Sequence, residues 1–310
     1  MPELPEVETM RRGIAGIAGA RIVSADFPRT RVRPLTIEPR PVVLGRRLVG
    51  RTIGAVLRRG KRVVLELVDG DHSADTDWLA IEPRMTGLML VVDPPTDEHV
   101  RLVLTLQHSS RGDGPVRLLF WDRRGLGTIR LHDRAGLDAA CGPRKLGPDG
   151  LEVTGADLAG RLGRSRRAVK PALLDQRAVA GIGNIYAAEI LFRVGIDPRT
   201  ACRRLSRDAW ERIAAAARSV LAEAVRCEGS SIGDETYRTA DNRVGRFQHR
   251  HRVYGREGEP CAACGTPVLR IVQAQRATFF CGECQRRPRG RRRSPGSRRG
   301  LPTNERGAIE

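Results

Sequence analysis

Four cysteines near the C-terminus have the spacing of a metal site. Cys261 and Cys264 form one Cys-x2-Cys pair, and Cys281 and Cys284 form a second pair sixteen residues later. Each pair can direct two thiolates at one ion, and four sulfurs complete the tetrahedral shell that zinc accepts. Because this shell leaves no open coordination position, the pattern predicts one structural Zn²⁺ and no zinc chemistry.

The segment between the two cysteine pairs is predicted to form a two-stranded hairpin. Its strands are Val268–Val272 and Ala277–Phe280, and its turn is Gln273–Arg276. This turn would present Arg276 to a phosphate backbone or a groove. By themselves these residues indicate only a small zinc ribbon, and an ordinary surface role for Arg276 stays open.

The amino terminus carries a second set of chemically active residues. Pro2 is small enough for Met1 to be removed, which would leave a free secondary amine beside Glu3. An α-amino group has an ordinary pKa of about 7.7–8.0, so a usable fraction is unprotonated at neutral pH. Such an amine attacks a sugar C1′ carbon to give an iminium directly, and Glu3 could carry the protons. Alone, a Met-Pro-Glu start is an ordinary sequence.

The charge of the chain indicates a polyanionic partner. Its 310 residues include 55 Lys and Arg against 36 Asp and Glu, a formal net charge of +19. Nucleic acid is the commonest reason for such an excess, with an anionic membrane surface second. No apolar run reaches the roughly 18 residues of a membrane span, and the start lacks a secretion signal. We expect a cytoplasmic, nucleoid-associated protein with no membrane partner.

Residues 50–131 are rich in short β-type runs. Turn-forming segments separate these runs, which predicts a sandwich or a barrel. A helix is expected before them, over Pro5–Ile17, with Glu6 near its start where the helix dipole favours negative charge. The expected strands are Arg62–Val68, Leu88–Val92, Val100–Leu106, Val116–Trp121 and Thr128–Leu131.

Residues 141–150 break both periodicities and are predicted to be a linker into a helical region. Asp208–Arg226 has one apolar stripe at helical spacing, and shorter helices are expected over Lys170–Val179 and Ile185–Phe192. We expect four parts: a catalytic domain over 1–140, a helical DNA-binding domain over 141–250, a zinc finger over 251–285 and a disordered basic tail over 286–310.

Several motifs together closely resemble the formamidopyrimidine-DNA glycosylase/endonuclease VIII family. They are PELPEVE at 2–8, GKR at 60–62, AGIGNIYAAEILF at 180–192 and the two finger segments at 253–265 and 275–285. The resemblance implies an α+β fold with an N-terminal β-sandwich flanked by helices, a helical helix–two-turn–helix region and a C-terminal zinc ribbon. Double-stranded DNA containing a damaged base would lie in the cleft between the halves.

The resemblance also implies roles for individual residues. Pro2 is the expected nucleophile, Glu3 the proton carrier and Glu6 a supporting active-site carboxylate. Lys61 would contact the phosphates that flank the lesion and assist catalysis. In the same way Asn184 matches the asparagine in the turn of the helix–two-turn–helix motif, where the glycines at 181 and 183 expose backbone N–H groups that suit a phosphate. Arg276 matches the finger arginine that grips phosphates around the extruded nucleotide.

Extrusion of a base leaves a hole that side chains must fill. By the resemblance Met85, Arg124 and Leu126 occupy those positions, although Leu126 stands where phenylalanine is usual, which puts the preference for the opposite base in doubt. Glu82 stands where many members have a histidine near the backbone, and Arg84 is a candidate for that phosphate contact. The segment Gly229–Gly245 should sense the damaged base through its Ser, Thr and Tyr side chains, although a solvated loop explains it equally well.

The expected activity is therefore excision of 8-oxoguanine and formamidopyrimidines through a proline iminium, followed by β,δ-elimination. One alternative is an endonuclease VIII-like enzyme for oxidised pyrimidines. Another is a non-catalytic DNA-binding protein on the same scaffold, which would not need Pro2, Glu3 and Lys61. By the same resemblance the protein is expected to act as a monomer.

Overall fold

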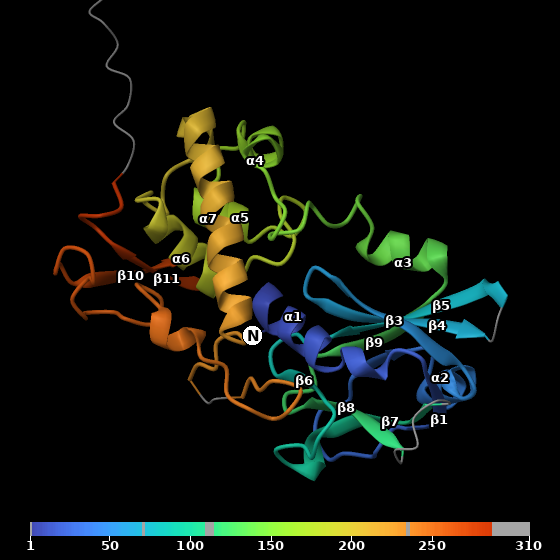
Figure 1. The fold of residues 1–310 in the computed structure, drawn as a ribbon. Coiled ribbons are helices and arrows are strands. Elements are labelled where there is room, and N and C mark those ends of the chain that lie inside the picture. Colours follow the sequence, from blue (N-terminus) through green and yellow to red (C-terminus); the bar gives the residue numbers. More distant parts are fainter. Residues whose placement is uncertain (1, 70–71, 109–114, 234–235, 287–310) are drawn as a thin grey trace, which may run out of the picture.

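The computed structural model describes residues 2–69, 72–108, 115–233 and 236–286. The basic tail expected over 286–310 lies, apart from Arg286, outside the described residues. Two structural halves meet at the N-terminus, which lies between the sheet and the long helix α7, Arg207–Arg226 (Figure 1).

A nine-stranded sheet forms the first half of the molecule, in the order β2-β9-β5-β4-β3-β1-β7-β8-β6. All neighbours are antiparallel except β2 and β9. The strands are β1 Ala20–Asp26, β2 Thr36–Glu38, β3 Thr52–Arg59, β4 Arg62–Asp69, β5 His72–Glu82, β6 Gly87–Leu90, β7 Val100–His108, β8 Val116–Asp122 and β9 Thr128–His132. The five strands expected from the sequence are all present within two residues of their expected ends.

The sheet closes on itself as a sandwich. β1 and β3 pair at one position only, Arg21 with Thr52, and the sheet folds over at this junction. Leu65 of β4 on one side and Leu104 of β7 on the other belong to the same buried cluster. The core therefore lies between the two layers, as the alternating apolar residues of the strands require.

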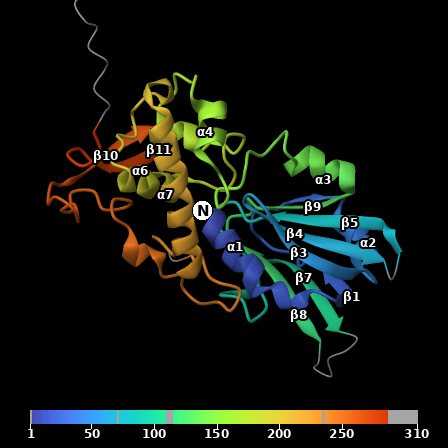
Figure 2. The same ribbon diagram turned by 45° about the horizontal axis from the view of Figure 1, so that its top comes forward.

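Helix α1, Leu4–Gly13, joins the two halves (Figure 2). Val7 and Met10 are buried in the sandwich core, whereas Leu4 belongs to the core of the helical half. The expected helix over Pro5–Ile17 was too long, because α1 ends at Gly13 and Ala15–Ile17 forms a separate 3₁₀ turn. The N-terminal residues are thus held by both halves at once.

A buried charge network anchors α1 to the second half. Glu8 accepts hydrogen bonds from Arg11, Arg12 and Arg58, and Arg58 also bridges to Asp149 at 2.7 Å. Burial opposes ionisation of Glu8, but these guanidinium groups outweigh it and lower its pKa to about 2.

The second half is helical. Its long helix α7 buries Trp210, Ile213 and Leu221 along one face, which confirms the apolar stripe. The helix expected over Lys170–Val179 ends early, because α5 stops at Leu173 and turns follow. The remaining helices are α2 Pro41–Leu48, α3 Arg134–Cys141, α4 Gly155–Leu162, α5 Val169–Leu173 and α6 Asn184–Arg193, with 3₁₀ turns at Asp97–His99, Cys202–Arg204 and Phe247–Arg250.

The C-terminal strands β10, Val268–Gln273, and β11, Arg276–Cys281, form the expected hairpin. This hairpin lies far from the sheet in both views (Figures 1 and 2). Its base packs on α6 through Ala188, Val253 and the buried Cys261 and Cys281. Among the described residues, no helix combines the length and apolar character needed to cross a membrane.

Candidate active site

A hollow of about 190 Å³ lies where the N-terminus, the β3–β4 turn, the start of α6 and the finger hairpin meet. Four residues singled out from the sequence line it together: Pro2, Lys61, Asn184 and Arg276. They are separated by up to 274 positions in the chain, and only the fold brings them to one place. The wall is completed by Glu82, Arg84, Leu174, Gln176 and Gly183.

Glu3 is buried directly behind this hollow, against the start of α6. Its Oε1 accepts a hydrogen bond from the Ile185 amide at 3.0 Å, so the positive end of the helix faces the carboxylate. Within the described part of the chain no hydrogen bond reaches its Oε2. That buried oxygen is therefore available to exchange a proton with a group that enters the hollow.

The glycines of the segment before α6 make room for the N-terminus. A Cβ atom on Gly183 would lie 2.2 Å from Glu3 Cδ, and one on Gly181 would lie 2.4 Å from Leu4 Cδ1. Gly181 has φ +96° and its carbonyl accepts from the Leu4 amide at 3.0 Å. The turn receives Glu3 and Leu4, and the Gly181 amide donates to Gln176 Oε1 at 2.9 Å. The expected phosphate contact of this turn stays a prediction.

Glu6 is fully buried and satisfied within the protein. Its Oε2 accepts from the Glu3 amide at 2.8 Å, while its Oε1 accepts from Tyr186 Oη at 2.5 Å and from the Ser230 amide at 2.8 Å. Burial, with a further contribution from the nearby charge of Glu3, raises the pKa of Glu6 even though these hydrogen bonds oppose the shift. Glu6 thus supports the N-terminal segment from behind and is poised to hold a proton.

Lys61 occupies the two-residue turn between β3 and β4, where Gly60 has φ +58°. Burial lowers the pKa of Lys61, and although Glu3 and Glu6 act in the opposite direction, Arg276 adds to the lowering. The ammonium therefore releases its proton more readily than an exposed lysine does, while it remains beside two carboxylates.

Asn184 and Lys170 connect the helical region to the finger. Asn184 Nδ2 donates to the Ala277 carbonyl at 3.0 Å, and Lys170 Nζ donates to Asn184 Oδ1 at 2.6 Å and to Thr278 Oγ1 at 2.9 Å. Lys170 is almost fully buried, and burial lowers its pKa to about 8. The sequence analysis did not single it out, although a lysine inside the apolar run at 169–174 was a usable signal.

The tip of the hairpin is held in an unusual backbone conformation. Ala274 and Gln275, the two residues between β10 and β11, have φ of +46° and +62°, as a tight two-residue hairpin turn requires. Arg276 follows as the first residue of β11 and is exposed. The hairpin therefore brings Arg276 to the hollow that Lys61 also lines.

Met85, Arg124 and Leu126 lie on two neighbouring loops outside the hollow. Met85 and Arg124 are exposed and Leu126 is half-buried. The loops are tied together by Thr86 and Asp122: Thr86 donates to the Asp122 carboxylate, which also accepts from the Gly127 amide at 2.8 Å. Sequence reasoning missed Thr86 and Asp122, whose buried hydrogen bond ties together the two loops that carry these three residues.

Glu82 is neutralised by two arginines at the edge of the hollow. Arg62 contacts it at 2.9 Å and Arg84 at 3.1 Å. Arg84 has φ +54°, a conformation that a residue other than glycine rarely adopts. Its guanidinium is half-exposed and oriented by Glu82, so the phosphate contact expected of Arg84 stays a prediction with a defined geometry.

The segment expected to sense the base is largely engaged within the protein. Ser230 and Ser231 are buried, and Ser231 Oγ donates to the Tyr237 carbonyl at 2.6 Å. The Tyr237 hydroxyl is also buried and donates to the Glu228 carbonyl at 3.0 Å. These three side chains are thus not open to the hollow; positions 234–235 lie outside the described residues.

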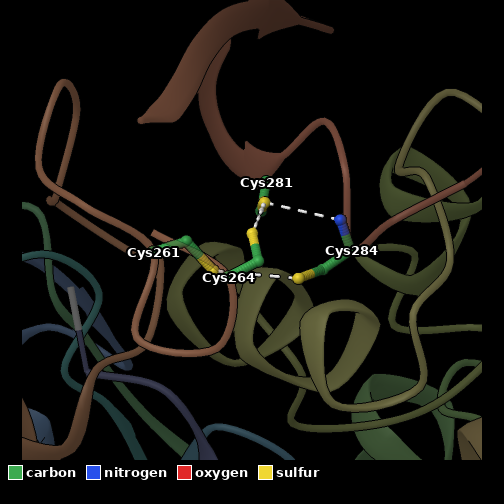
Figure 3. A group of neighbouring side chains, drawn as sticks. All are labelled: Cys261, Cys264, Cys281 and Cys284. Atoms are coloured by element: carbon green, nitrogen blue, oxygen red, sulfur yellow. Dashed lines mark hydrogen bonds between the residues drawn. The ribbon is translucent and has the colours of Figure 1, made fainter. Parts of the chain in front are cut away.

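The four finger cysteines converge on one point (Figure 3). All four sulfurs lie within 4.8 Å of one another, with Cys261 and Cys284 at 3.9 Å and Cys264 and Cys281 at 3.5 Å. A tetrahedral zinc with bonds of about 2.3 Å to sulfur holds its ligands roughly 3.8 Å apart. The donor set and its spacing therefore fit one structural Zn²⁺.

Three family models match the chain. Residues 1–129 match the formamidopyrimidine-DNA glycosylase N-terminal domain, residues 146–236 match the H2TH domain of the same family, and residues 258–287 match the zinc finger found in FPG and IleRS. The three matches follow one another in the order sheet, helices, finger, which is the order of the parts in the structure.

Curated relatives and solved structures match nearly the whole chain. Formamidopyrimidine-DNA glycosylase of Solibacter usitatus is 38% identical over 93% of this chain and 100% of its own, and that of Bacillus subtilis is 39% identical over 92% and 99%. The MutM (FPG) protein of Thermus thermophilus superposes with a TM-score of 0.77 at 37% identity, covering 93% of this chain and 100% of its own. A Lactococcus lactis FPG variant bound to Fapy-dG DNA superposes with a TM-score of 0.77 at 30% identity, covering 92% and 100%.

Proposed function

The chain belongs to the formamidopyrimidine-DNA glycosylase family, and we propose that the residues around its buried N-terminus carry out the family's reaction. It is a DNA repair glycosylase that removes oxidised purines such as 8-oxoguanine and formamidopyrimidines, and it has AP lyase activity. One observation supports the assignment of residues best: Pro2 lines the hollow and the buried Glu3 lies behind it, with one oxygen that accepts no hydrogen bond from the residues that the structure describes.

The reaction begins at Pro2 once Met1 has been removed. The unprotonated amine attacks C1′ of the damaged nucleotide, the bond from C1′ to the base breaks, and the base leaves with a proton supplied by an active-site acid. Loss of the remaining proton from Pro2 and opening of the sugar ring give an iminium. Elimination of the 3′ and then the 5′ phosphate through this iminium cleaves the strand.

Glu3 and Lys61 handle the protons of this sequence. Glu3 Oε2 protonates the ring oxygen as the sugar opens and takes up a proton during elimination. Lys61, whose pKa is lowered by burial, holds a flanking phosphate and releases its proton more readily than an exposed lysine does. Glu6 keeps the Glu3 amide in place through a 2.8 Å hydrogen bond.

The partner is double-stranded DNA that contains a damaged base. Solved relatives are bound to DNA containing Fapy-dG, an abasic site or carbocyclic 8-oxo-G. Arg276 and Asn184 hold phosphates around the extruded nucleotide, and Arg84 makes the phosphate contact that the carboxylate of Glu82 cannot make. Side chains fill the space that the extruded base leaves in the base stack: Met85, Arg124 and Leu126. The four-cysteine site holds a structural Zn²⁺ that keeps the Arg276 hairpin on α6.

The proposal also covers the domains, the oligomeric state and the location of the protein. The catalytic domain is 1–140, the helix–two-turn–helix domain 141–250 and the finger 251–285, and the protein acts as a monomer in the cytoplasm on nucleoid DNA. Separate cores in the sheet and the helical half support this division.

Borohydride trapping tests the proposal. The protein with a native N-terminus is mixed with a duplex that contains one 8-oxoguanine opposite cytosine, and the trapped peptide is identified by mass. We expect the adduct on Pro2, and a large loss of trapped product with Pro2→Gly, which replaces the secondary amine by a primary one. Trapping at another residue, or full cleavage by Glu3→Gln, would contradict the assigned roles, and the absence of any adduct would favour a non-catalytic binder.

A further inference from the structure

A chain of buried hydrogen bonds leads from Glu6 away from the hollow. Glu6 Oε1 lies 2.5 Å from Tyr186 Oη, which lies 3.4 Å from Ser230 Oγ, which in turn lies 3.1 Å from His251 Nε2. Tyr186 and Ser230 are buried, and Glu6 is bonded on its other oxygen to the amide of Glu3. The chain therefore connects the carboxylate behind the reacting N-terminus with the imidazole of His251.

His251 opens onto a second hollow of about 780 Å³ between α6, α7 and the segment around 247–259. This hollow shares none of its lining residues with the one that contains Pro2. The imidazole packs edge-on against the rings of Phe247 and Tyr254 and is itself half-buried. The outer end of the chain is thus next to solvent, while its inner end is not.

The same heavy atoms accommodate two proton arrangements. Tyr186 donates to Glu6 when Glu6 is a carboxylate. If Glu6 is protonated on Oε1, this hydrogen bond is reversed: Glu6 donates to Tyr186, Tyr186 donates to Ser230 and Ser230 donates to a neutral His251. If the proton is on His251 instead, every hydrogen bond reverses, and Ser230 and Tyr186 donate inward to a Glu6 carboxylate. The hydroxyl groups of Tyr186 and Ser230 carry one proton each in both arrangements. The net change is therefore the transfer of one proton from Glu6 to His251.

The two ends favour the first arrangement at rest. Burial raises the pKa of Glu6, and burial lowers the pKa of His251 to about 4, an effect that the neighbouring His249 strengthens and a hydrogen bond with the Tyr254 backbone opposes. A positive charge that forms near Glu6 reverses this preference, because it stabilises the carboxylate.

The fixed charges around His251 largely compensate one another. Glu223 of α7 pairs with Arg193 of α6 and with Arg250, and Arg256 pairs with Glu259. The carboxylate of Glu189, also on α6, accepts from the amides of residues 252–254. The remaining charged side chain of this wall is Arg252, with His249 beside it. No uncompensated carboxylate among the described residues would therefore trap a proton on His251.

We propose that Tyr186 and Ser230 form a proton relay by which Glu6 discharges its proton to His251 while the iminium forms on Pro2. The inference rests on the proposed function of Pro2. In the step, Glu6 gives its proton to Tyr186 Oη, Tyr186 gives its own to Ser230 Oγ, and Ser230 gives its own to His251 Nε2. Glu6 becomes a carboxylate as Pro2 becomes a cation, and the imidazolium returns the proton to solvent through the second hollow.

His251 is a positioning residue in this scheme, because it acts through Glu6. The physical gain is charge compensation: a carboxylate directly behind the amide of Glu3 stabilises the new cation in a buried site. We expect about a tenfold loss when the relay is cut, which is below the roughly 10²–10⁴-fold that a directly acting acid or base contributes.

The test compares variants along the chain. His251→Gln keeps a polar partner for Ser230 but takes no proton. Ser230→Ala removes only the hydroxyl, since the Ser230 amide still donates to Glu6. His249→Gln is the matched control, because His249 is an exposed histidine of the same hollow that lies outside the chain. Single-turnover excision of 8-oxoguanine is measured from pH 5 to 9 for each, with melting temperature as the check on folding.

We expect His251→Gln and Ser230→Ala to lose about tenfold and to share an altered pH profile. His249→Gln should keep at least the unmodified rate, because it removes only a charge that disfavours a proton on His251. In His251→Ala, added imidazole should enter the second hollow and restore the rate, and it should fail to do so when Ser230→Ala is present as well. Wild-type rates and profiles in the His251 variants would overturn the relay, as would a loss that imidazole does not restore.

A proton inventory on the unmodified protein provides a readout that does not depend on any variant. Several protons in transit give a curved dependence of rate on the deuterium fraction, whereas a straight line overturns the relay. Failure of the proposed function would look different, because the unmodified protein would then neither excise 8-oxoguanine nor form an adduct on Pro2.

Discussion

The contact between Gly183 and Glu3 yields the sharpest prediction about the active site. An alanine Cβ at Gly183 would lie 2.2 Å from Glu3 Cδ and 2.5 Å from both carboxylate oxygens. Ordinary contacts begin at 3.4 Å, so the carboxyl group must move by about 1.2 Å. Gly183→Ala therefore displaces Glu3 from the hollow without touching any side chain that would contact DNA.

The expected loss follows from that displacement. A misplacement of about 1 Å in a catalytic group costs on the order of 10²-fold in rate. Glu3 would also lose its 3.0 Å hydrogen bond from the Ile185 amide, and an unsatisfied buried donor costs about 1–3 kcal/mol of stability. We expect Gly183→Ala to lower the single-turnover rate of 8-oxoguanine excision about 10²-fold and to melt at a lower temperature, while binding to undamaged duplex is unchanged.

Gly160→Ala is the matched control for this substitution. Gly160 lies within α4, where an added Cβ meets nothing within 4 Å, so the change should raise stability by up to about 1 kcal/mol and leave the rate unchanged. The assay is excision from a duplex with one 8-oxoguanine, in enzyme excess, with melting followed by circular dichroism. A Gly183→Ala protein that excises at the full rate would refute the argument that Glu3 must remain against the start of α6.

Three further predictions follow from other parts of the structure. Removal of zinc by a chelator, or Cys264→Ser, should release the hairpin from α6 and abolish tight DNA binding, while the sandwich still melts cooperatively. Fluorescence anisotropy measures the binding, and unchanged binding would contradict a structural role for the metal. Arg58→Met should cost about 3 kcal/mol in urea unfolding, because it leaves Glu8 and Asp149 without their shared partner. The pKa of Glu8 is about 2 in the folded protein against an ordinary 4.5, so its ion pairs stabilise the fold above pH 4.5 and this stabilisation is lost as the pH falls toward 2. The loss of stability in acid should be smaller in Arg58→Met. An identical pH dependence of the two proteins would contradict the network. Leu126→Phe should increase the difference in excision rate between duplexes that carry different bases opposite 8-oxoguanine, because an aromatic ring stacks on a base whereas an aliphatic side chain only fills space. Equal differences in the two proteins would show that position 126 does not determine the preference for the opposite base.

Much of the fold was predictable from local pattern. Five strands, the long apolar stripe of α7, the helix α6 and the finger hairpin follow from periodicities of two and 3.6 residues and from turn chemistry, which act over neighbouring positions. The zinc site was equally accessible, because ligand identity and spacing are properties of the sequence itself. Strands β1, β2, β3 and β5 and helices α2 to α4 were not singled out. Brevity explains only β2 and the helices, because β3 and β5 are as long as the strands that were predicted.

Local pattern failed where distant groups decide the outcome. The predicted helix over Lys170–Val179 has an apolar run, but it ends at Leu173 because the side chain of Gln176 instead bonds the carbonyl of Ile182 and the amide of Gly181. The glycines before α6 showed only that the turn is tight. That Gly183 makes room for Glu3 depends on a packing contact across 180 positions.

The sequence by itself determined the family and the zinc ligands and led to the prediction that Pro2 is the reactive amine, because these depend on which residues are present and in what order. Tertiary structure alone decided that Glu3 keeps an oxygen without a hydrogen bond among the described residues, that Lys61 and Glu6 have shifted pKa values, and that Tyr186 and Ser230 connect Glu6 to His251. Burial and the approach of charges set these properties, and both arise only when segments far apart in the chain exclude water together.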